Sequence, residues 1–176
     1  MAKSTLDDLK ARRSVKAYKP DQVTDADLEA ILEAGTFAPT GAGAQAAVIV
    51  AVQNEAVRDQ LERLNADVLK NPSAKPFYGA PTVLAVVVDK TKPTPLEDGA
   101  LVLGNLQNAA YALGVDSCWI HRAKEVFESA EGKDLLKKWG LDPSVYFGVG
   151  FCILGYASGE RPTAKPRKPD YVIRVK

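Results

Sequence analysis

The clearest candidate for binding chemistry lies near the start of the chain, where Arg12, Arg13, Ser14 and Lys16 fall within one short stretch. Guanidinium groups, a hydroxyl and an ammonium together suit a phosphate group, because arginine offers paired N–H donors and lysine a mobile positive charge. Basic residues near a helix end also complement the helix dipole without binding a ligand. The spacing therefore indicates a phosphate site but leaves a purely structural role open.

A second group of cations lies at the opposite end of the chain. Residues 1–20 hold six Lys or Arg against two Asp, and residues 161–176 hold six against one, although the net charge of the chain is only +1. Hydrophobic and turn residues are interspersed in both ends, which is unlike a disordered arm. The ends are either two solvated tails or, if they meet, a site for a small dianion such as a phosphate monoester.

Several classes of function are disfavoured by what the sequence lacks. The neutral charge balance and the absence of a basic stripe interleaved with aromatic residues argue against nucleic acid. His121 is the single histidine, and Cys118 and Cys152 have no metal-type spacing, so neither a catalytic triad nor a metal site is expected. The glycine-rich nucleotide fingerprints are also missing. If the protein is an enzyme, an organic cofactor is the natural source of its chemistry.

Alternating apolar patterns indicate the elements that must position these residues. Helices are expected over 5–13, from the Thr24 cap to about Gly35, and over 54–70, 97–113 and 131–139. Strands are expected over 47–53, 83–88, 115–120, 146–156 and 171–175. The alternation predicts an α/β or α+β class, with one central sheet covered by helices in a single domain, 1–176. The last strand could be an edge of that sheet or a strand donated to another subunit.

The cellular setting is predicted from segments that are missing and from the small number of cysteines. No apolar run reaches the roughly 18 residues that a membrane span needs. No signal peptide is visible behind the first residues, and two cysteines suit a reducing compartment. We therefore expect a cytoplasmic protein that does not contact a membrane.

Five motifs in chain order resemble those of the FMN-dependent nitroreductase family. Residues 12–18 (RRSVKAY) resemble its opening Arg-Arg-Ser-x-Arg/Lys-x-Phe/Tyr motif, and residues 38–45 (APTGAGAQ) resemble its Ala-Pro-Ser-x-x-Asn-x-Gln loop. Residues 104–114 resemble its long central helix, residues 118–120 a strand that ends at the flavin ring, and residues 164–169 (AKPRKP) its C-terminal basic motif. Each motif alone is weak, but the series covers the whole chain.

The resemblance implies a three-layer α-β-α fold of the α+β class, with a central mixed, mainly antiparallel sheet and a C-terminal strand donated to the partner subunit. It also implies a homodimer with FMN at the interface. By similarity, the cofactor-binding residues of one subunit are those with cationic or hydroxyl side chains at the two chain ends: Arg12, Arg13, Ser14, Lys16, Lys165 and Arg167. Lys16 would lie near the pyrimidine edge of the flavin, where a fixed cation could tune the ring.

The remaining cofactor contacts implied by the resemblance come from two loops. Pro39, Thr40, Gly41 and Gln45 would come from the partner subunit and cover the ring. This loop departs from the family pattern, since Thr40 replaces the usual Ser and Gly43 replaces the usual Asn, which removes one polar contact.

The second loop follows the expected strand 115–120. The resemblance implies that backbone N–H groups at His121 and Arg122 would bond the N5 and O4 atoms of the flavin. The His121 side chain is equally consistent with an exposed loop residue and with a proton donor to the acceptor. Arg122 could instead meet a nicotinamide phosphate or a substrate carboxylate.

The activity implied by the resemblance is hydride transfer from NADH or NADPH, through flavin N5, to a small acceptor such as a nitroaromatic or a quinone, by a ping-pong mechanism. No protein side chain is a certain catalyst, although Lys16 and His121 are candidates. Two alternatives stay open, a non-catalytic FMN carrier or sensor of the same fold and a phosphate-binding regulatory module without flavin. Chemistry on halogenated aromatics, as some relatives perform, is also compatible with the fold.

Overall fold

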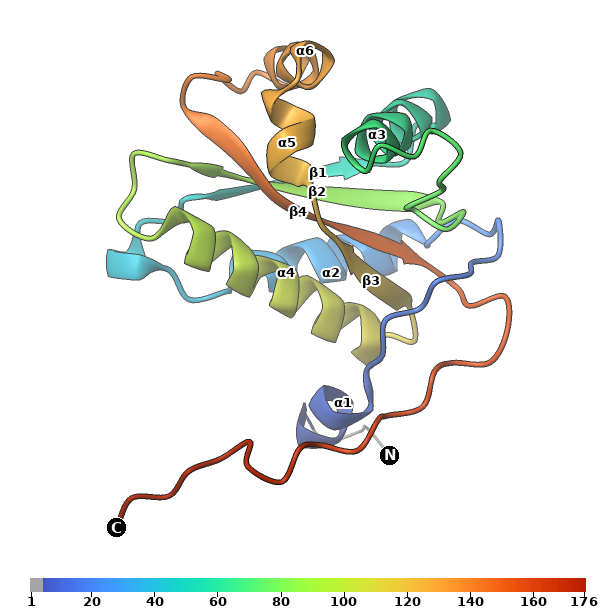
Figure 1. The fold of residues 1–176 in the computed structure, drawn as a ribbon, viewed down its shortest axis with the longest axis vertical. Coiled ribbons are helices and arrows are strands. Elements are labelled where there is room, and N and C mark those ends of the chain that lie inside the picture. Colours follow the sequence, from blue (N-terminus) through green and yellow to red (C-terminus); the bar gives the residue numbers. More distant parts are fainter. Residues whose placement is uncertain (1–4) are drawn as a thin grey trace.

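A four-stranded sheet forms the centre of the molecule in the computed structural model, which describes residues 5–176 (Figure 1). The strands lie in the order β1-β2-β4-β3, and every neighbouring pair is antiparallel. Their bounds are β1 (Ala47–Val52), β2 (Thr82–Asp89), β3 (Asp116–Ile120) and β4 (Tyr146–Gly155). The two central strands, β2 and β4, are almost wholly buried, as expected for strands covered on both faces.

Alternating side chains of β2 build two separate cores. Val83, Ala85 and Val87 join one cluster of buried residues, whereas Leu84 and Val86 join the other. This follows from the two-residue period of a strand, which turns successive side chains to opposite faces. Both faces therefore need a cover of helices.

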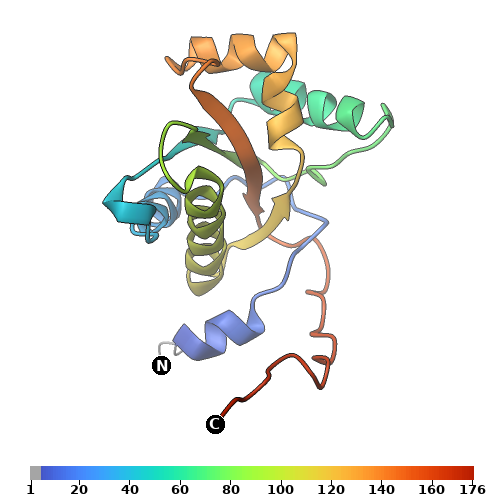
Figure 2. The same ribbon diagram turned by 60° about the vertical axis from the view of Figure 1, so that its left-hand side comes forward.

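Helices cover both faces and complete a three-layer α-β-α arrangement (Figures 1 and 2). One face carries α2 (Asp25–Thr36) and α4 (Pro95–Ala112), and the other carries α3 (Glu55–Val68), α5 (Ala123–Glu128) and α6 (Ala130–Lys138). The short α1 (Thr5–Ala11) packs near the end of α4, and the 3-10 turn η1 (Gly41–Gly43) precedes β1. None of the helices in the described part of the chain is long and apolar enough to cross a membrane.

The expected α+β class and the order of the main elements are confirmed. The Thr24 cap is also present, with its Oγ1 accepting a hydrogen bond from the backbone N–H of Asp27 at 3.1 Å. The pairs between named strands are all antiparallel, and the one parallel contact near the sheet is a single bridge between Ser14 and Ser117. The helix α5 was not predicted.

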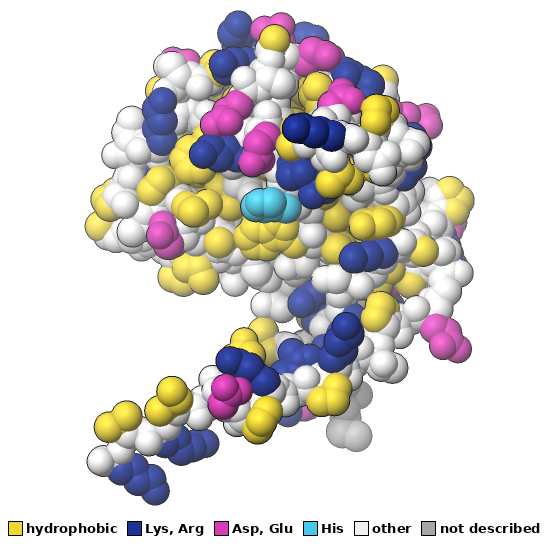
Figure 3. All heavy atoms as spheres, viewed as in Figure 1, with side chains coloured by type: hydrophobic (Ala, Val, Ile, Leu, Met, Phe, Trp, Pro, Cys, Tyr) yellow, Lys and Arg dark blue, Asp and Glu magenta, His cyan; other side chains and the backbone are white. Residues whose placement is uncertain are grey.

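The C-terminal segment, residues 157–176, leaves the sheet and runs past α1 in an extended, exposed course (Figures 1 and 2). Residues 171–175 form no strand in the single chain, so the expectation of an edge strand in the chain's own sheet is wrong. Figure 3 shows cationic and hydrophobic side chains along this segment, standing clear of the body. Ile173 is 87% exposed and Val175 is 94% exposed, and donation of this strand to a second subunit stays a prediction.

Candidate functional site

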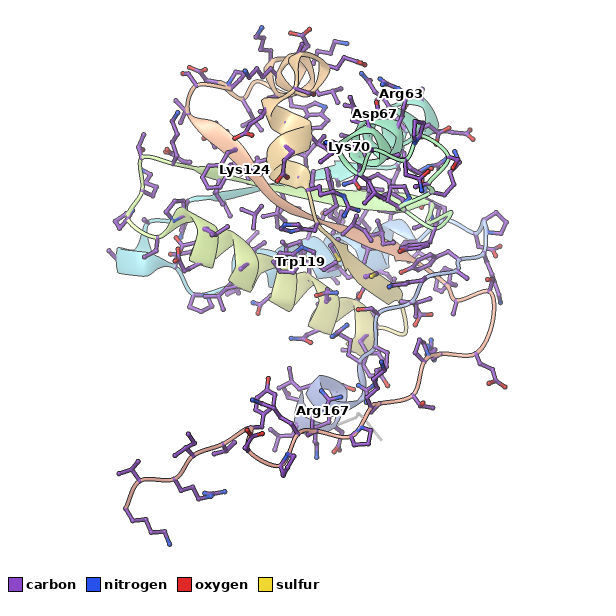
Figure 4. The ribbon with its side chains drawn as sticks, viewed as in Figure 1. Arg63, Asp67, Lys70, Trp119, Lys124 and Arg167 are labelled. Carbon is purple, nitrogen blue, oxygen red and sulfur yellow. The ribbon has the colours of Figure 1, made fainter. Side chains whose placement is uncertain are left out.

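The two basic ends of the chain line the same hollow. Its volume is about 440 Å³, and its walls are Leu9, Lys10, Arg12, Arg13, Ala164, Lys165 and Arg167. Figure 4 shows Arg167 lying against α1, where the C-terminal segment passes that helix. Cations that are more than 150 residues apart in sequence are therefore gathered on one small surface. Their close approach raises the local positive potential and favours an anion.

Among the residues that line this hollow, Arg12 carries the most informative donor. Its Nη1 atom is buried and finds no hydrogen-bond partner among residues 5–176. Arg13, by contrast, donates from Nη1 to the backbone carbonyls of Lys10 at 2.7 Å and of Arg12 at 2.6 Å. Leaving a buried charged donor unpaired is costly, so Arg12 fits a ligand that supplies acceptor oxygens.

The edge of the sheet positions the residues that follow Arg13. The backbone N–H of Val15 donates to the carbonyl of Ser117 at 3.1 Å, and the Tyr18 hydroxyl donates to the carbonyl of Val15 at 2.9 Å. Ser14 and Lys16 flank Val15 and are exposed. The ammonium of Lys16 lies 5.8 Å from the centre of the Tyr78 ring.

The thiol of Cys118 lies beneath this segment. Burial raises the pKa of the Cys118 thiol, whereas a hydrogen bond with Ser14 and the positive charges of Lys16 and Arg12 lower it. The balance favours the neutral thiol, which suits a small buried core residue. Cys118 and Cys152 are both free and buried.

The predicted ring-covering loop lies around η1 and is held by a buried carboxylate. Asp98 is 2% exposed, and its Oδ1 accepts hydrogen bonds from the backbone N–H of Gly41 at 2.9 Å and from Thr94 Oγ1 at 2.9 Å. A Cβ atom on Gly41 would lie 2.0 Å from Thr94 Oγ1, so this position has no space for a side chain. The Thr40 hydroxyl accepts from the backbone N–H of Gln45 at 3.2 Å and closes the loop.

Left-handed backbone at several positions gives this loop its shape. The φ angles are 52° at Ala42, 66° at Gly43 and 48° at Gln45. Glycine and asparagine adopt this region more easily than other residues. Position 43 is therefore one at which glycine can replace the asparagine of the family motif while keeping the backbone course.

Beneath the loop lies an apolar hollow of about 310 Å³. It is lined by Leu32, Gly35, Thr36, Ala38, Thr40, Gln45, Ala47, Ile49 and Val102. Of the predicted loop residues, Thr40 and Gly41 are half-buried, whereas Pro39 and Gln45 are exposed. The exposed ones are free to contact a ligand or a second chain.

The basic hollow and the η1 loop do not meet within one chain. The loop is tied to Asp98 in the first turn of α4, whereas Ala112 at the other end of α4 lines a hollow together with Leu9 of α1. An α4 of 18 residues extends about 27 Å at 1.5 Å per residue. Most of that length separates the two groups of predicted site residues, in agreement with Figures 1 and 2.

The turn after β3 is fixed by a buried asparagine. Asn65 of α3 is fully buried; its Nδ2 donates to the carbonyl of His121 at 2.8 Å, and its Oδ1 accepts from Arg122 Nε at 3.0 Å. Arg122 has a φ of 76°, a left-handed conformation that is strained for a long side chain. Such strain is typical of functional turns. The left-handed residue fixes the course of the backbone at this turn, and the His121 side chain is exposed.

The sequence did not single out three buried polar residues, Asn65, Asp98 and Asp116. Each is a polar side chain almost wholly buried, at 0%, 2% and 3% exposure. Only Asn65 left a signal, because it interrupts the apolar face that Leu61 and Leu64 form in α3. Among the described residues, no cluster of His, Cys, Asp and Glu could hold a metal ion.

Comparisons with known proteins place these features in a family. The family model described as "Nitroreductase family" matches residues 9–156. A Staphylococcus aureus protein, provisionally named an NAD(P)H nitroreductase, is 24% identical over an alignment of 211 positions that covers 96% of this chain and 93% of the relative.

Solved structures agree with this match. A nitroreductase from Bacteroides fragilis with bound FMN is 29% identical, with a TM-score of 0.89, and the match covers 99% of this chain and 100% of that chain. A nitroreductase from Desulfitobacterium hafniense with bound FMN is 26% identical, with a TM-score of 0.86, and the match covers the whole of both chains.

Proposed function

This chain belongs to the nitroreductase family, and we propose that it is an FMN-dependent oxidoreductase that passes hydride from NADH or NADPH to a small acceptor. Nitroaromatics and quinones are the acceptors to test first. The proposal rests on the family match and on the chemistry of the residues that converge at the two chain ends.

The basic hollow is the observation that carries the proposal. It combines Arg12, Arg13, Lys165 and Arg167 around one cavity, and the Arg12 guanidinium has a buried nitrogen without a partner among residues 5–176. The phosphate of FMN would supply the missing acceptor, and paired N–H donors of arginine suit its oxygens. The residues present therefore fit a phosphate monoester.

The residues after Arg13 would hold the rest of the cofactor. Ser14 and Lys16 are exposed beside β3, where a hydroxyl can bond the ribityl chain and an ammonium can neutralise charge that develops on reduction. The left-handed turn at His121–Arg122 would offer its backbone N–H groups to the ring. When bound, FMN supplies the hydride acceptor and donor at its N5 atom.

A second copy of the chain would complete the site. The loop at Pro39–Gln45 lies at the far end of α4 from the basic hollow, so one chain cannot place both groups around one flavin. A homodimer with C2 symmetry would bring the loop of each chain to the hollow of the other. The exposed segment 171–175, which is mainly apolar, would pack against the partner subunit.

Spectroscopy and steady-state kinetics test this function. The purified protein mixed with FMN should show the absorbance of bound flavin at about 450 nm. NADH or NADPH should bleach this absorbance under anaerobic conditions, and a quinone should restore it. Donor and acceptor using the same site should give parallel double-reciprocal lines. A protein that binds FMN without being reduced is a carrier, and a protein that binds no FMN contradicts the proposal altogether.

A further inference from the structure

The first residue of β3, Asp116, has contacts that its place in the sheet does not require. Its carboxylate accepts hydrogen bonds from Arg161 Nε at 2.7 Å, from Arg161 Nη2 at 3.2 Å and from the backbone N–H of Ala157 at 2.9 Å. The Asp116 side chain is 2% exposed, whereas that of Arg161 is 54% exposed. A buried carboxylate thus holds the start of the C-terminal segment through a bidentate contact with an arginine.

The same end of β3 also holds the N-terminal basic segment. Ser117, the next residue, accepts the backbone N–H of Val15 at 3.1 Å. The N-terminal and C-terminal segments also pair directly with each other. The backbone N–H of Ser158 donates to the carbonyl of Ala17, and the N–H of Lys19 donates to the carbonyl of Tyr156. One strand end therefore aligns the two segments that carry the cations of the basic hollow.

Arg161 is the last firm attachment before those cations. The four residues from Arg161 to Lys165 span at most about 14 Å when extended. Pro162 lies within this stretch and restricts its backbone, so less freedom remains between the attachment and Lys165. From 159 onwards the segment is exposed, and within residues 5–176 Arg167 bonds only the nearby carbonyl of Lys165. The place of Lys165 at the hollow therefore depends on the contact at Arg161.

We propose that Asp116 and Arg161 form a clasp that positions the C-terminal cations against Arg12 and Arg13 and thereby sets the affinity for a phosphate monoester. Neither residue lines the basic hollow, so both act as positioning residues. The proposal rests on the proposed function for the identity of the ligand as FMN. It assigns a role to a buried carboxylate that contacts no ligand.

Paired measurements with FMN and riboflavin test the clasp, because riboflavin lacks the phosphate. Arg161→Gln is the main variant, since the half-exposed side chain can be replaced without opening the core. We expect the dissociation constant for FMN to rise about tenfold, as for loss of a charged hydrogen-bonded contact, while that for riboflavin changes less than about twofold. Arg161→Lys keeps the positive charge but loses the bidentate guanidinium geometry. Its dissociation constant for FMN should lie between those of wild type and Arg161→Gln.

Lys176→Gln is the matched control, because it removes one positive charge from an exposed position of the same C-terminal segment, outside residues 171–175. It should leave the ratio of the two affinities at the wild-type value. An unchanged FMN affinity in Arg161→Gln contradicts the clasp. Equal weakening of FMN and riboflavin also contradicts it, because a general loss of structure affects both ligands.

A measurement without flavin separates the clasp from the proposed function. Amide hydrogen exchange at Ala157 and Ser158 should be about tenfold faster in Arg161→Gln than in wild type or Lys176→Gln, because the segment opens more often. Unchanged exchange overturns the clasp even if FMN binds. Conversely, a wild-type protein that binds no FMN overturns the proposed function, and the exchange rates still decide the clasp.

Discussion

The two ends of α4 carry opposite kinds of surface. At one end, the two chain ends bring five cations to one hollow, and a buried nitrogen of one of them, Arg12, has no partner among residues 5–176. At the other end, an apolar hollow lies under a loop in which the backbone N–H groups of Gly41 and Gln45 are bonded to the Asp98 and Thr40 side chains. The first region attracts a charged ligand, whereas the second has a fixed shape.

Under the proposed function, the two regions would divide the recognition of FMN, with one binding its charged end and the other its aromatic end. Charge tolerates imprecise placement, because long side chains of arginine and lysine can follow a phosphate. A surface that covers a flat ring needs a defined backbone, and the left-handed residues and the close contact at Gly41 would supply one if the loop has this role. The variants below separate the two functions.

The largest effect is expected from Arg12→Ala. Removing the guanidinium whose nitrogen lacks a protein partner should weaken FMN binding about a hundredfold, since charge-assisted contacts to phosphate are the strong ones. Riboflavin affinity should stay within about threefold. Flavin fluorescence titration measures both constants. A similar loss for both ligands would mean that Arg12 supports the fold and does not recognise phosphate.

A substitution in the η1 loop should change the stability of the fold more than the binding of phosphate. Gly41→Ala places a methyl group against Thr94 and should lower the free energy of unfolding by about 2 kcal/mol, as overpacking does. Urea denaturation of the protein without flavin measures this change. Gly104→Ala is the control, because a Cβ there meets nothing within 4 Å. Equal stability of the two variants would contradict the rigid loop.

Salt provides a test that needs no substitution. Raising ionic strength from about 0.05 to 0.5 M should weaken FMN binding about fivefold, because exposed cations at the hollow are screened. Riboflavin, which has no phosphate, should show almost no change. Equilibrium titrations at several salt concentrations give the slope for each ligand. Equal slopes would place the FMN phosphate away from the basic hollow.

The smallest effect is expected where the sequence departs from the family motif. Gly43→Asn should change the free energy of unfolding by less than about 0.5 kcal/mol, because asparagine tolerates the left-handed φ of 66° and a Cβ has open space there. Gly43→Val should cost about 1–2 kcal/mol, because a β-branched residue is strained in that region. Thermal denaturation of the pair checks this order, and a reversed order would contradict the observed backbone.

Local patterns predicted most of the fold because buried strands and amphipathic helices leave periodic signals. The helix α5 escaped because six residues, with only Val126 and Phe127 as large apolar side chains, give no clear period. Residues 171–175 form no strand in the single chain, because an apolar pattern indicates an extended segment without indicating what it pairs with.

The candidate site was predicted less completely, for a different reason. Basic residues at both chain ends were visible as charge, and the structure brings them to one hollow. Buried polar residues such as Asn65 and Asp116 bond partners 41 to 57 positions away, which no local pattern encodes. Roles of His121 and Lys16 in catalysis stay predictions.

Sedimentation monitored at the flavin absorbance tests most directly whether two chains complete each site. With FMN added, the absorbance at about 450 nm should sediment with a species of twice 18.9 kDa and with one FMN per chain. Flavin absorbance that sediments with a single 18.9 kDa chain would contradict a site shared between subunits, since one chain would then hold the cofactor alone.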